Sequence, residues 1–510
     1  MAPSDPPPLR RASQPGRAPP PSVLHSDRRD TFHLLVSCQG ISQTGCLAPG
    51  VDCATRHPVP ASSDAERRFL RGVSCEINTK DIEARPVTDT KSEIRAHALL
   101  IDKLAGGTAT NPDLPLAGVL IADFSRLLPG PWCTQLLSDM GATVIKIERP
   151  DGGDLSRANA PHFKTGSVYF NSVNGGKHSV TLDLSDAKGR AIAHKLIAEA
   201  DVVVETFRPG VAKNLGIDYE TAKGLNKGVV YCSLSGFGQT GPLSHISGHD
   251  LVIQALSGFA GLSAQPGKAP DVPGFQAADY AGATMAAIGI LGALMKRRAT
   301  GLGSNLDVAM FDSLFSMCNI SQTGSMARDV GNTGLPMFEV WGGNPRYGTY
   351  LTADNKAVAV ALLEKRLWVN FCEAIDRPDL IDHDESPEDR HSNHGDKAAR
   401  YRAAIAETCA AKNRDELIDE MTRKGVPITP VYSPDEALSS ENVAGRGLIE
   451  YVDHPAEGRI PQIVNPLATS GLAVKGRAAA PEAGDATDAV LAGLGFDTDT
   501  IAQLRSDGVV

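Results

Sequence analysis

The sequence has no surplus of positive charge, no long apolar run and few aromatic residues. It carries 50 basic and 60 acidic residues, a formal net charge of −10, which argues against a protein that binds nucleic acid through bulk positive charge. A local basic pocket for an anionic ligand is still compatible with that balance. No apolar run reaches the roughly 18 residues of a membrane span, and the nearest, Tyr280–Met295, is expected to be a buried helix. The sequence therefore predicts no nucleic-acid partner and no membrane association.

Motifs for metals and for common cofactors are also missing. The nine cysteines include no C-x-x-C pair, so the sequence predicts neither a zinc site nor a disulfide framework, and a reducing, cytoplasmic setting is expected. There is no P-loop, no G-x-S-x-G and no H-E-x-x-H. Residues 236–241 match G-x-G-x-x-G, but Pro242 follows directly and no acidic residue closes a strand about 20 residues later, which excludes a dinucleotide fingerprint. His383, His391 and His394 have no standard metal-site spacing, and we expect a solvated loop there.

Residues 1–112 differ in composition from the remainder. Proline triplets at 6–8 and 19–21 accompany paired arginines, and apolar periodicity is weak until about Leu114. This pattern predicts a disordered Pro/Arg-rich extension. Two interpretations of it are left open. The first is a transit peptide, which would place the protein in mitochondria, although the acidic residues of the extension argue against it. The second is a translation start that was assigned too far upstream, because no methionine lies between Met1 and Met140. We favour the second slightly.

From about residue 114 the pattern is that of an α/β fold. Strands and helices alternate at the spacing of right-handed βαβ units, with a third short segment at Thr181–Leu184 and a helix expected from Ser185 as its cap to about Ala200. A long helix is expected from about Asp279 to Arg298. The clearest apolar runs, predicted to be buried strands, are Gly118–Asp123, Thr143–Ile147, Asp201–Glu205 and Val229–Ser233.

The pattern changes after Trp341. A hairpin is predicted over 347–362, followed by helices over Arg366–Ile375 and Lys397–Ala411. We therefore predict a large domain over residues 113–334, a smaller α+β domain over 335–435, and a C-terminal segment, 436–510, that returns to the large domain.

Asp279 is the most informative ionisable residue, and two readings of it are balanced. Small residues surround it at the start of an apolar helix. As an N-cap it would have a common structural role. As a carboxylate in a largely apolar cleft it would be a nucleophile or a proton carrier.

Ordered motifs over nearly 400 residues, from about Leu114 to Val510, carry a resemblance to the class III (family III) CoA-transferases, the group that includes formyl-CoA and carnitine CoA-transferases. The resemblance implies a Rossmann-like large domain, a small domain, and two ring-shaped subunits interlocked as a homodimer. The matching stretches are 122–131, 141–150, 152–154, 177–183, 205–210, 231–242, 248–250 and 278–279.

The resemblance implies a covalent mechanism at Asp279. Asp279 matches the family's catalytic aspartate, which attacks an acyl-CoA thioester, becomes an aspartyl-CoA thioester through a mixed anhydride, and passes the CoA to a carboxylic acid. Gly342 and Gly343 match a glycine loop that covers the intermediate. CoA is then a co-substrate, no cofactor is bound permanently, and the partners are an acyl-CoA and a carboxylic acid.

The resemblance also implies a CoA-binding set. Arg149 matches a CoA-contacting arginine. Arg208 and Lys177 are candidate cations for phosphate or the cleft edge, which only their motif context distinguishes from solvated surface charges. Arg346, near the glycine loop, is either a clamp for a substrate carboxylate or an ordinary surface arginine. Ser185 and Asn214 stand where some members place cations for the phosphates, so phosphate contacts are expected to be fewer or to come from elsewhere. Further matched contact positions are Leu127, Leu128, Leu182, Thr206 and Phe207.

An alternative from the same superfamily is an α-methylacyl-CoA racemase. His249, in Gly248-His249-Asp250, stands 30 residues before Asp279, the racemase spacing, and Glu364 falls where racemases keep a glutamate beside the histidine. Residues 251–255 lack the racemase Asn-Tyr, however, and two other stretches, 169–173 and 311–313, look more transferase-like. The sequence thus predicts a transferase first, a racemase acting through His249 and Asp279 second, and a CoA-binding module without catalysis last.

Overall fold

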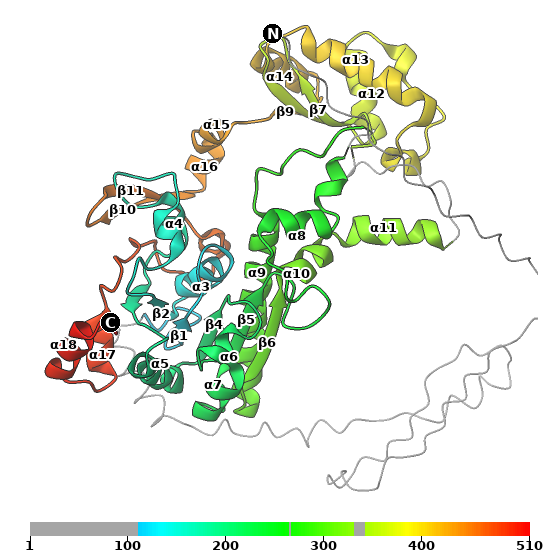
Figure 1. Cartoon of the computed structure of the whole chain (residues 1–510). Coiled ribbons are helices and arrows are strands. Elements are labelled where there is room, and N and C mark those ends of the chain that lie inside the picture. The colour runs from blue at the N-terminus through cyan, green and yellow to red at the C-terminus, as the bar shows by residue number, and fades with distance from the viewer. Residues whose placement is uncertain (1–110, 265–266, 331–341) are drawn as a thin grey trace, which may run out of the picture. The chain divides into compact units, whose positions relative to one another are not determined.

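A computed structural model describes residues 111–264, 267–330 and 342–510 (Figure 1). The extension predicted over residues 1–112 therefore lies almost wholly outside the described residues.

The first layer is a six-stranded sheet in the order β3-β2-β1-β4-β5-β6, with every pair of neighbours parallel. This confirms the predicted α/β class. The order reverses between β1 and β4, and ligands of such sheets bind where the strand order reverses, beyond the carboxyl ends of the strands. The strands are β1 Leu120–Asp123, β2 Thr143–Glu148, β3 His178–Thr181, β4 Val202–Glu205, β5 Val230–Ser235 and β6 Ser304–Ala309.

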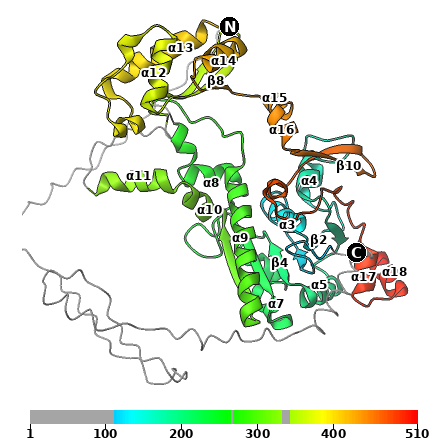
Figure 2. The same cartoon turned by 180° about the vertical axis from the view of Figure 1, so that it is seen from behind.

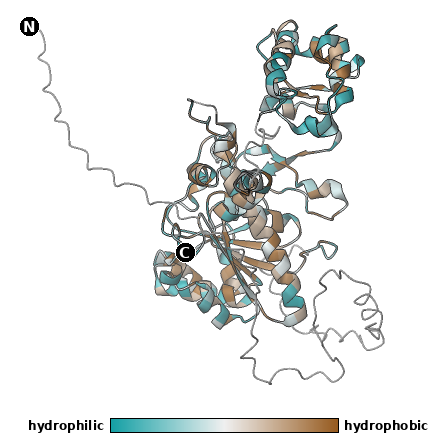
Figure 3. Ribbon diagram, turned by 90° about the vertical axis from the view of Figure 1, so that its right-hand side faces the viewer, coloured by the Kyte–Doolittle hydropathy of each residue, from teal (hydrophilic) through white to brown (hydrophobic). Residues whose placement is uncertain are grey.

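Helices cover both faces of this sheet, and Figure 3 shows hydrophobic strands between them. Alternate strand residues point to opposite faces, so Ile121 joins one apolar core and Ala122 the other. Figure 2 shows α9 in front of the strands when the molecule is seen from behind. One face carries α3 (Pro129–Asp139), α9 (Ala277–Thr300) and α10 (Met310–Met317); the other carries α5 (Ala187–Glu199), α7 (Tyr219–Leu225), α17 (Thr487–Gly493) and α18 (Thr498–Ser506).

Helix α9 is long and apolar enough to cross a membrane by length and composition alone, and half of its apolar stretch is buried inside the protein. It packs against α3, β5, β6 and α10, and it ends in Arg297 and Arg298 at its negative dipole end. Its position shows it to be a core helix of the first layer.

The second layer, which we call the three-stranded layer, has its own apolar core around Trp368, Phe371 and Leu417. Its antiparallel strands are β7 Tyr347–Leu351, β8 Ala357–Ala361 and β9 Ile428–Pro430. The sequence predicted the hairpin and two helices to within two residues but missed β9, which is only three residues long. The helices are α12 Lys365–Ala374, α13 Ala398–Ala410 and α14 Arg414–Arg423.

The C-terminal segment contacts the six-stranded layer. The N–H of Lys475 donates to the carbonyl of Asp139 at 2.7 Å, and the N–H of Ala486 donates to that of Ser179 at 3.0 Å. The same segment contains an antiparallel hairpin that the sequence did not reveal, formed by β10 Ile449–His454 and β11 Gly458–Ile463. The remaining helices are α4 Val168–Val173, α6 Val211–Asn214, α8 Asp250–Leu256, α11 Asn319–Asp329, α15 Pro434–Leu438 and α16 Glu441–Gly445.

Two local predictions are wrong. The third strand is His178–Thr181 and not Thr181–Leu184, because the chain leaves the sheet at Asp183, whose N–H bonds the carbonyl of Val509 at 2.8 Å. The cap of α5 is Asp186, whose carboxylate accepts from the N–H of Lys188, while Ser185 bonds the side chain of Asp183.

Candidate active site

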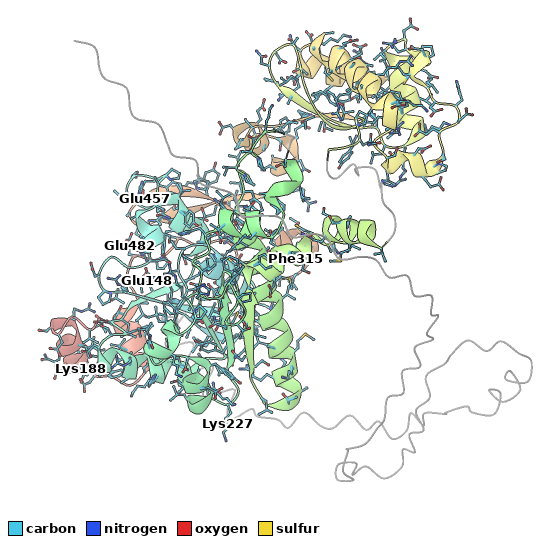
Figure 4. The ribbon with its side chains drawn as sticks, turned by 45° about the vertical axis from the view of Figure 1, so that its right-hand side comes forward. Glu148, Lys188, Lys227, Phe315, Glu457 and Glu482 are labelled. Carbon is cyan, nitrogen blue, oxygen red and sulfur yellow. The ribbon has the colours of Figure 1, made fainter. Side chains whose placement is uncertain are left out.

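The candidate site lies at the carboxyl edge of the six-stranded sheet. Parallel strands all end at one edge, and a helix that connects two of them must run back from it. Helix α9 is such a helix between β5 and β6, and soon after its end the N–H of Gly303 bonds the carbonyl of Lys227 at the opposite edge. Figure 4 labels Lys227 at that lower edge and Glu148, the last residue of β2, well above it. Asp279, near the start of α9, therefore shares the carboxyl edge with the loops that follow β1 to β4.

Asp279 is the third residue of α9 and is half-buried behind the buried Ala277 and Ala278. Burial, and next the negative charge of Asp250, raise the pKa of its carboxyl from 3.8 to about 7. Within the described part of the chain no side chain donates a hydrogen bond to this carboxylate. A partly buried ionisable group without a hydrogen-bonding side chain among the described residues is the arrangement expected of a nucleophile.

The reading of Asp279 as an N-cap is wrong, because Asp250 performs that task from another helix. One carboxylate oxygen of Asp250 accepts hydrogen bonds from the N–H of Ala278 at 2.8 Å and from that of Asp279 at 3.2 Å. The Gln254 amide bonds the other oxygen of Asp250 and also the carbonyl of Phe275, at 2.9 Å. A contact that spans 28 positions leaves no local signal, so sequence reasoning missed it.

Aromatic side chains line the same region. The Tyr280 ring stacks on Phe275 at 4.9 Å and meets the edge of Trp132, from the first turn of α3, at 5.6 Å. Burial and the charge of Asp279 raise the pKa of the Tyr169 hydroxyl, which places Tyr169 of α4 within electrostatic reach of Asp279. The sequence analysis noted residues 169–173 only as a transferase-like stretch and gave Tyr169 no role.

The other predicted catalytic residues are not joined to Asp279 in the described structure. His249 is exposed at the residue before α8. Gly342 is exposed with φ +70°, Gly343 is half-buried, and Glu364 is exposed before α12, all beside the three-stranded layer. Among the residues described, no hydrogen bond or ion pair links any of these four to Asp279.

A cavity of about 530 Å³ lies beyond the ends of β1, β2, β3 and β4. Three of the predicted CoA-binding residues line it: Arg149, Leu182 and Phe207. Ser185 also lines it, as do Arg126, which the sequence did not single out, and the fully buried Lys146. The cavity therefore offers apolar walls and nearby cations at the place where this kind of sheet binds ligands.

The remaining predicted contacts do not line this cavity. Leu127 and Leu128 follow its Ser125–Arg126 wall in the loop between β1 and α3. The Thr206 hydroxyl accepts a hydrogen bond from the N–H of Arg126 at 3.1 Å, which joins the loops after β1 and β4. Arg208 is exposed and donates to the Ser247 hydroxyl at 2.9 Å.

The prediction that Lys177 is a cation for phosphate or the cleft edge is wrong. Its side chain is completely buried. The ammonium donates to the Pro131 carbonyl, the Thr134 hydroxyl and the Asn174 amide oxygen at 2.8–2.9 Å, and it pairs with Asp123 at 3.3 Å. Burial lowers the pKa of Lys177 to about 8. With four partners inside the protein, this cation stabilises the sheet edge and is closed to ligands.

The prediction that Arg346 is a substrate clamp is also wrong. The guanidinium is fully buried and bonds both carboxylate oxygens of Glu385, at 2.7 and 3.0 Å, and the carbonyl of Leu363 at 3.1 Å. A fork already filled by an internal carboxylate is not available to another.

The chain is similar to known proteins in sequence and in fold. A family model described as CoA-transferase family III matches residues 116–487. The chain is 34% identical over 353 residues to the acetyl-CoA:oxalate CoA-transferase of Acetobacter aceti, covering 67% of this chain and 87% of that one. It is 31% identical over 399 residues to the succinate–glutarate CoA-transferase of Agrobacterium fabrum, covering 74% and 96%. A solved CaiB/BaiF family protein from Brucella suis superposes with a TM-score of 0.65 at 28% identity, covering 75% and 100%.

Proposed function

This chain belongs to CoA-transferase family III and is a class III CoA-transferase, and we propose that it moves CoA from an acyl-CoA to a carboxylic acid through covalent intermediates on Asp279. The observation that carries the proposal is the Asp279 carboxylate, half-buried, unpaired and at the carboxyl edge of the sheet, with a pKa raised to about 7. The two relatives act on oxalate, succinate or glutarate by name, so dicarboxylic acids are the first acceptors to test.

The reaction balances without any proton transfer. A carboxylate oxygen of Asp279 attacks the thioester carbon, the C–S bond breaks, and CoA leaves as a thiolate beside an aspartyl-acyl anhydride. The thiolate attacks the aspartyl carbonyl, which releases the donor acid and leaves an aspartyl-CoA thioester. The acceptor carboxylate forms a second anhydride in the same way, and the returning thiolate takes the acceptor acyl group and regenerates Asp279.

The environment of Asp279 suits it both as the attacking nucleophile and as the carrier of the covalent intermediates. A carboxylate with a raised pKa is more basic and, when ionised, a better nucleophile than an ordinary one. Tyr169 lies within electrostatic reach of Asp279, and the residue after Asp279, Tyr280, packs against Trp132; apolar surroundings of this kind limit hydrolysis of the anhydride and thioester.

We assign CoA to the cavity of about 530 Å³. The Arg149 and Arg126 guanidinium groups would face the phosphates, and Leu182 and Phe207 would contact the adenine side. The loop that carries Leu127 and Leu128 leads from this cavity into α3, where Trp132 touches Tyr280, so the pantetheine arm would follow that loop towards Asp279. Thr206 and Arg208 would contact CoA from the loop after β4.

The glycines and the two racemase-type residues stay predictions. Gly342 and Gly343 would cover the aspartyl intermediate with their backbone N–H groups. His249 would shape the substrate cleft. The relatives found are CoA-transferases by name, and proton transfer by His249 with Glu364 is not proposed.

We further propose the domain plan of the family: a Rossmann-like large domain over 113–334, a small domain over 335–435, a C-terminal segment over 436–510, and an interlocked homodimer. Support comes from an apolar stripe that α9 exposes at Met285, Ile288 and Met295, three positions that share one face of a helix. An exposed apolar stripe on a core helix indicates a protein partner, and a second copy of this chain is the occupant proposed. A cytoplasmic enzyme fits the five described cysteines, which are all unpaired thiols.

The central test is substitution at Asp279 with a matched control. Asp279→Ala should abolish CoA transfer, by at least about 10³-fold, and should retain CoA binding. Asp271→Ala removes an exposed carboxylate eight residues earlier and should leave turnover unchanged. Mass spectrometry of the enzyme incubated with acetyl-, succinyl- or formyl-CoA alone should find CoA attached to the peptide that contains Asp279. Unchanged turnover in D279A would overturn the covalent proposal.

A second assay separates the transferase from the racemase. The enzyme is incubated with a 2-methylacyl-CoA in D₂O without any acceptor acid. Transfer chemistry leaves the α-hydrogen in place, whereas racemisation introduces deuterium there. Prompt α-deuteration would replace the transferase with the racemase acting through His249 and Asp279.

A further inference from the structure

The loop between β1 and α3 contains a strained backbone position that a buried ion pair holds. Leu127 has φ +64°, a left-handed conformation that is unfavourable for a residue with a side chain. The carboxylate of Asp154 accepts a hydrogen bond from the N–H of Leu127 at 3.1 Å. Leu127 is thus held in its left-handed conformation by a side chain 27 positions away.

The same loop is held from its other end. The ammonium of Lys146 donates to the carbonyl of Ser125 at 2.9 Å and pairs with the second oxygen of Asp154 at 2.8 Å. The side chains of Lys146 and Asp154 are 0% and 1% exposed. The Lys146–Asp154 pair therefore fixes the loop through two backbone groups, the carbonyl of Ser125 and the N–H of Leu127; we call this arrangement the clasp.

Asp154 is fixed in turn. Its first oxygen also accepts from the N–H and hydroxyl of Ser156, at 2.9 and 2.8 Å, and its own N–H donates to Glu148 at 2.7 Å. Arg157 bonds both oxygens of that glutamate, at 2.7 and 2.8 Å. The carboxylate of Asp154 consequently has little freedom to turn away from the loop.

Stability alone does not account for a buried pair of this kind. Replacing such a pair with apolar side chains of similar volume is often neutral or stabilising. Ser125, Lys146 and Asp154 all line the cavity assigned to CoA. Burying the two charges costs desolvation free energy. We therefore explain the pair by the conformation that it imposes on the wall of this cavity.

We propose that Asp154 and Lys146 are positioning residues that preorganise the β1–α3 loop for CoA. This rests on the proposed function in one respect, that CoA occupies the cavity of about 530 Å³. The pair does not take part in acyl transfer. Its effect is on affinity, because a loop already in its bound conformation saves the free energy of ordering it.

The first test measures CoA affinity by calorimetry, with free CoA as the probe. Asp154→Asn keeps an oxygen for Leu127 but loses the charge, and the double variant K146M/D154L replaces the pair with apolar side chains. We expect both to weaken the Kd for CoA and to raise the KM for acyl-CoA by about tenfold, with kcat changed less than about threefold. K146M/D154L should keep a melting temperature close to the wild type, so its weaker binding cannot be assigned to unfolding.

A matched control uses a second ion pair of the same sheet at the opposite edge. Asp201 bonds the N–H of Leu120 at 2.8 Å and pairs with Arg297 at 2.7 Å. Asp201→Asn should lower stability and leave the Kd for CoA unchanged. The proposal is overturned if D154N and K146M/D154L bind CoA within twofold of the wild type, or if D201N weakens binding equally.

A double-mutant cycle tests the role of the strained residue. Glycine adopts positive φ without penalty, so in the L127G background the loop no longer depends on Asp154. Asp154→Ala removes the acceptor of the Leu127 N–H, and the loss of affinity that it causes should fall from about tenfold in the wild-type background to about twofold there. An equal loss in both backgrounds would refute the clasp. Because CoA binding is measured without turnover, an enzyme that binds CoA but transfers none would refute the proposed function and leave this test intact.

Discussion

Asp250 accepts a hydrogen bond from the backbone N–H of Asp279 at 3.2 Å while its charge raises the pKa of the Asp279 side chain. The Asp250 carboxylate thus caps the helix that carries Asp279, the proposed nucleophile, and makes the Asp279 carboxyl harder to ionise. The positive end of the α9 dipole acts in the opposite direction. Burial and the charge of Asp250 together raise the pKa of Asp279 to about 7.

Asp250→Asn should separate the two roles of Asp250. The amide oxygen can still accept from the N–H groups of Ala278 and Asp279, but the negative charge is gone. The pKa of Asp279 should therefore fall, and the acid limb of the kcat/KM profile should move to lower pH. Asp250→Ala also loses the cap and should cost about 1 kcal/mol of stability. pH–rate profiles and urea unfolding measure the two effects, and an acid limb unmoved in D250N would contradict the electrostatic account.

Asp279→Asn should stabilise the protein above neutral pH. In the folded state the pKa of Asp279 is about 7, above its ordinary value of 3.8, so the folded protein binds this proton more tightly than the unfolded chain. The free energy of unfolding therefore falls as pH rises between those values, and the full cost is present above about 7. Removing the charge should raise the free energy of unfolding by about 1–3 kcal/mol at pH 8.

Urea unfolding at pH 8, 6 and 4 checks this difference. The gap between D279N and the wild type should shrink steadily towards zero at pH 4. D271N serves as a control, because Asp271 is exposed and its substitution should give no pH-dependent gap. A gap of equal size at all three pH values would mean that Asp279 is not a buried, hard-to-ionise carboxylate.

The sequence predicted those helices and strands that a short-range pattern of apolar residues determines. Apolar runs such as Thr143–Ile147 gave the buried parallel strands, and the uncharged stretch within 280–295 gave the core helix that presents Asp279. The boundaries of β3 were missed because its end depends on the N–H of Asp183 meeting Val509, more than 300 positions away. Such pairings exist only in the folded chain.

The same limit explains the errors at the site. Motif context marked Lys177 and Arg346 as cations facing ligand, but their partners, Asp123 and Glu385, are brought to them by tertiary packing. The role of Tyr169 was missed because tertiary packing also brings it near Asp279, and nothing close to Tyr169 in the sequence indicates that proximity. Residue type and motif identify candidates, whereas burial and partners decide which of them can reach a substrate.

Lys177→Met and Arg149→Ala should have opposite profiles. Removing Lys177 leaves Asp123 buried without its closest cation and should cost about 3–5 kcal/mol of stability. Arg149 is largely exposed at the cavity, so R149A should leave the melting temperature unchanged and raise the KM for acyl-CoA about three- to tenfold, less at high salt. Denaturant unfolding and kinetics at two ionic strengths separate them. A stable K177M enzyme with weakened CoA binding would restore the phosphate role that the structure removes.

The apolar stripe on α9 gives the last prediction. Met285, Ile288 and Met295 are 39%, 56% and 71% exposed, an arrangement that is unfavourable in water unless a partner covers it. The double variant M285E/I288E would bury two unpaired charges in that interface, at a cost of several kcal/mol each. Sedimentation should therefore show a dimer for the wild type and a monomer for the variant.

The control for that experiment is Leu225→Glu, which places a charge on a comparably exposed apolar residue, 41% exposed, at the end of α7. Helix α7 lies on the other face of the sheet from α9, so L225E should leave the dimer intact. Because the two helices cover opposite faces, a loss of dimer in both variants would point to general unfolding, which circular dichroism detects. A dimer that persists in a folded M285E/I288E would show that α9 is not the interface between the subunits.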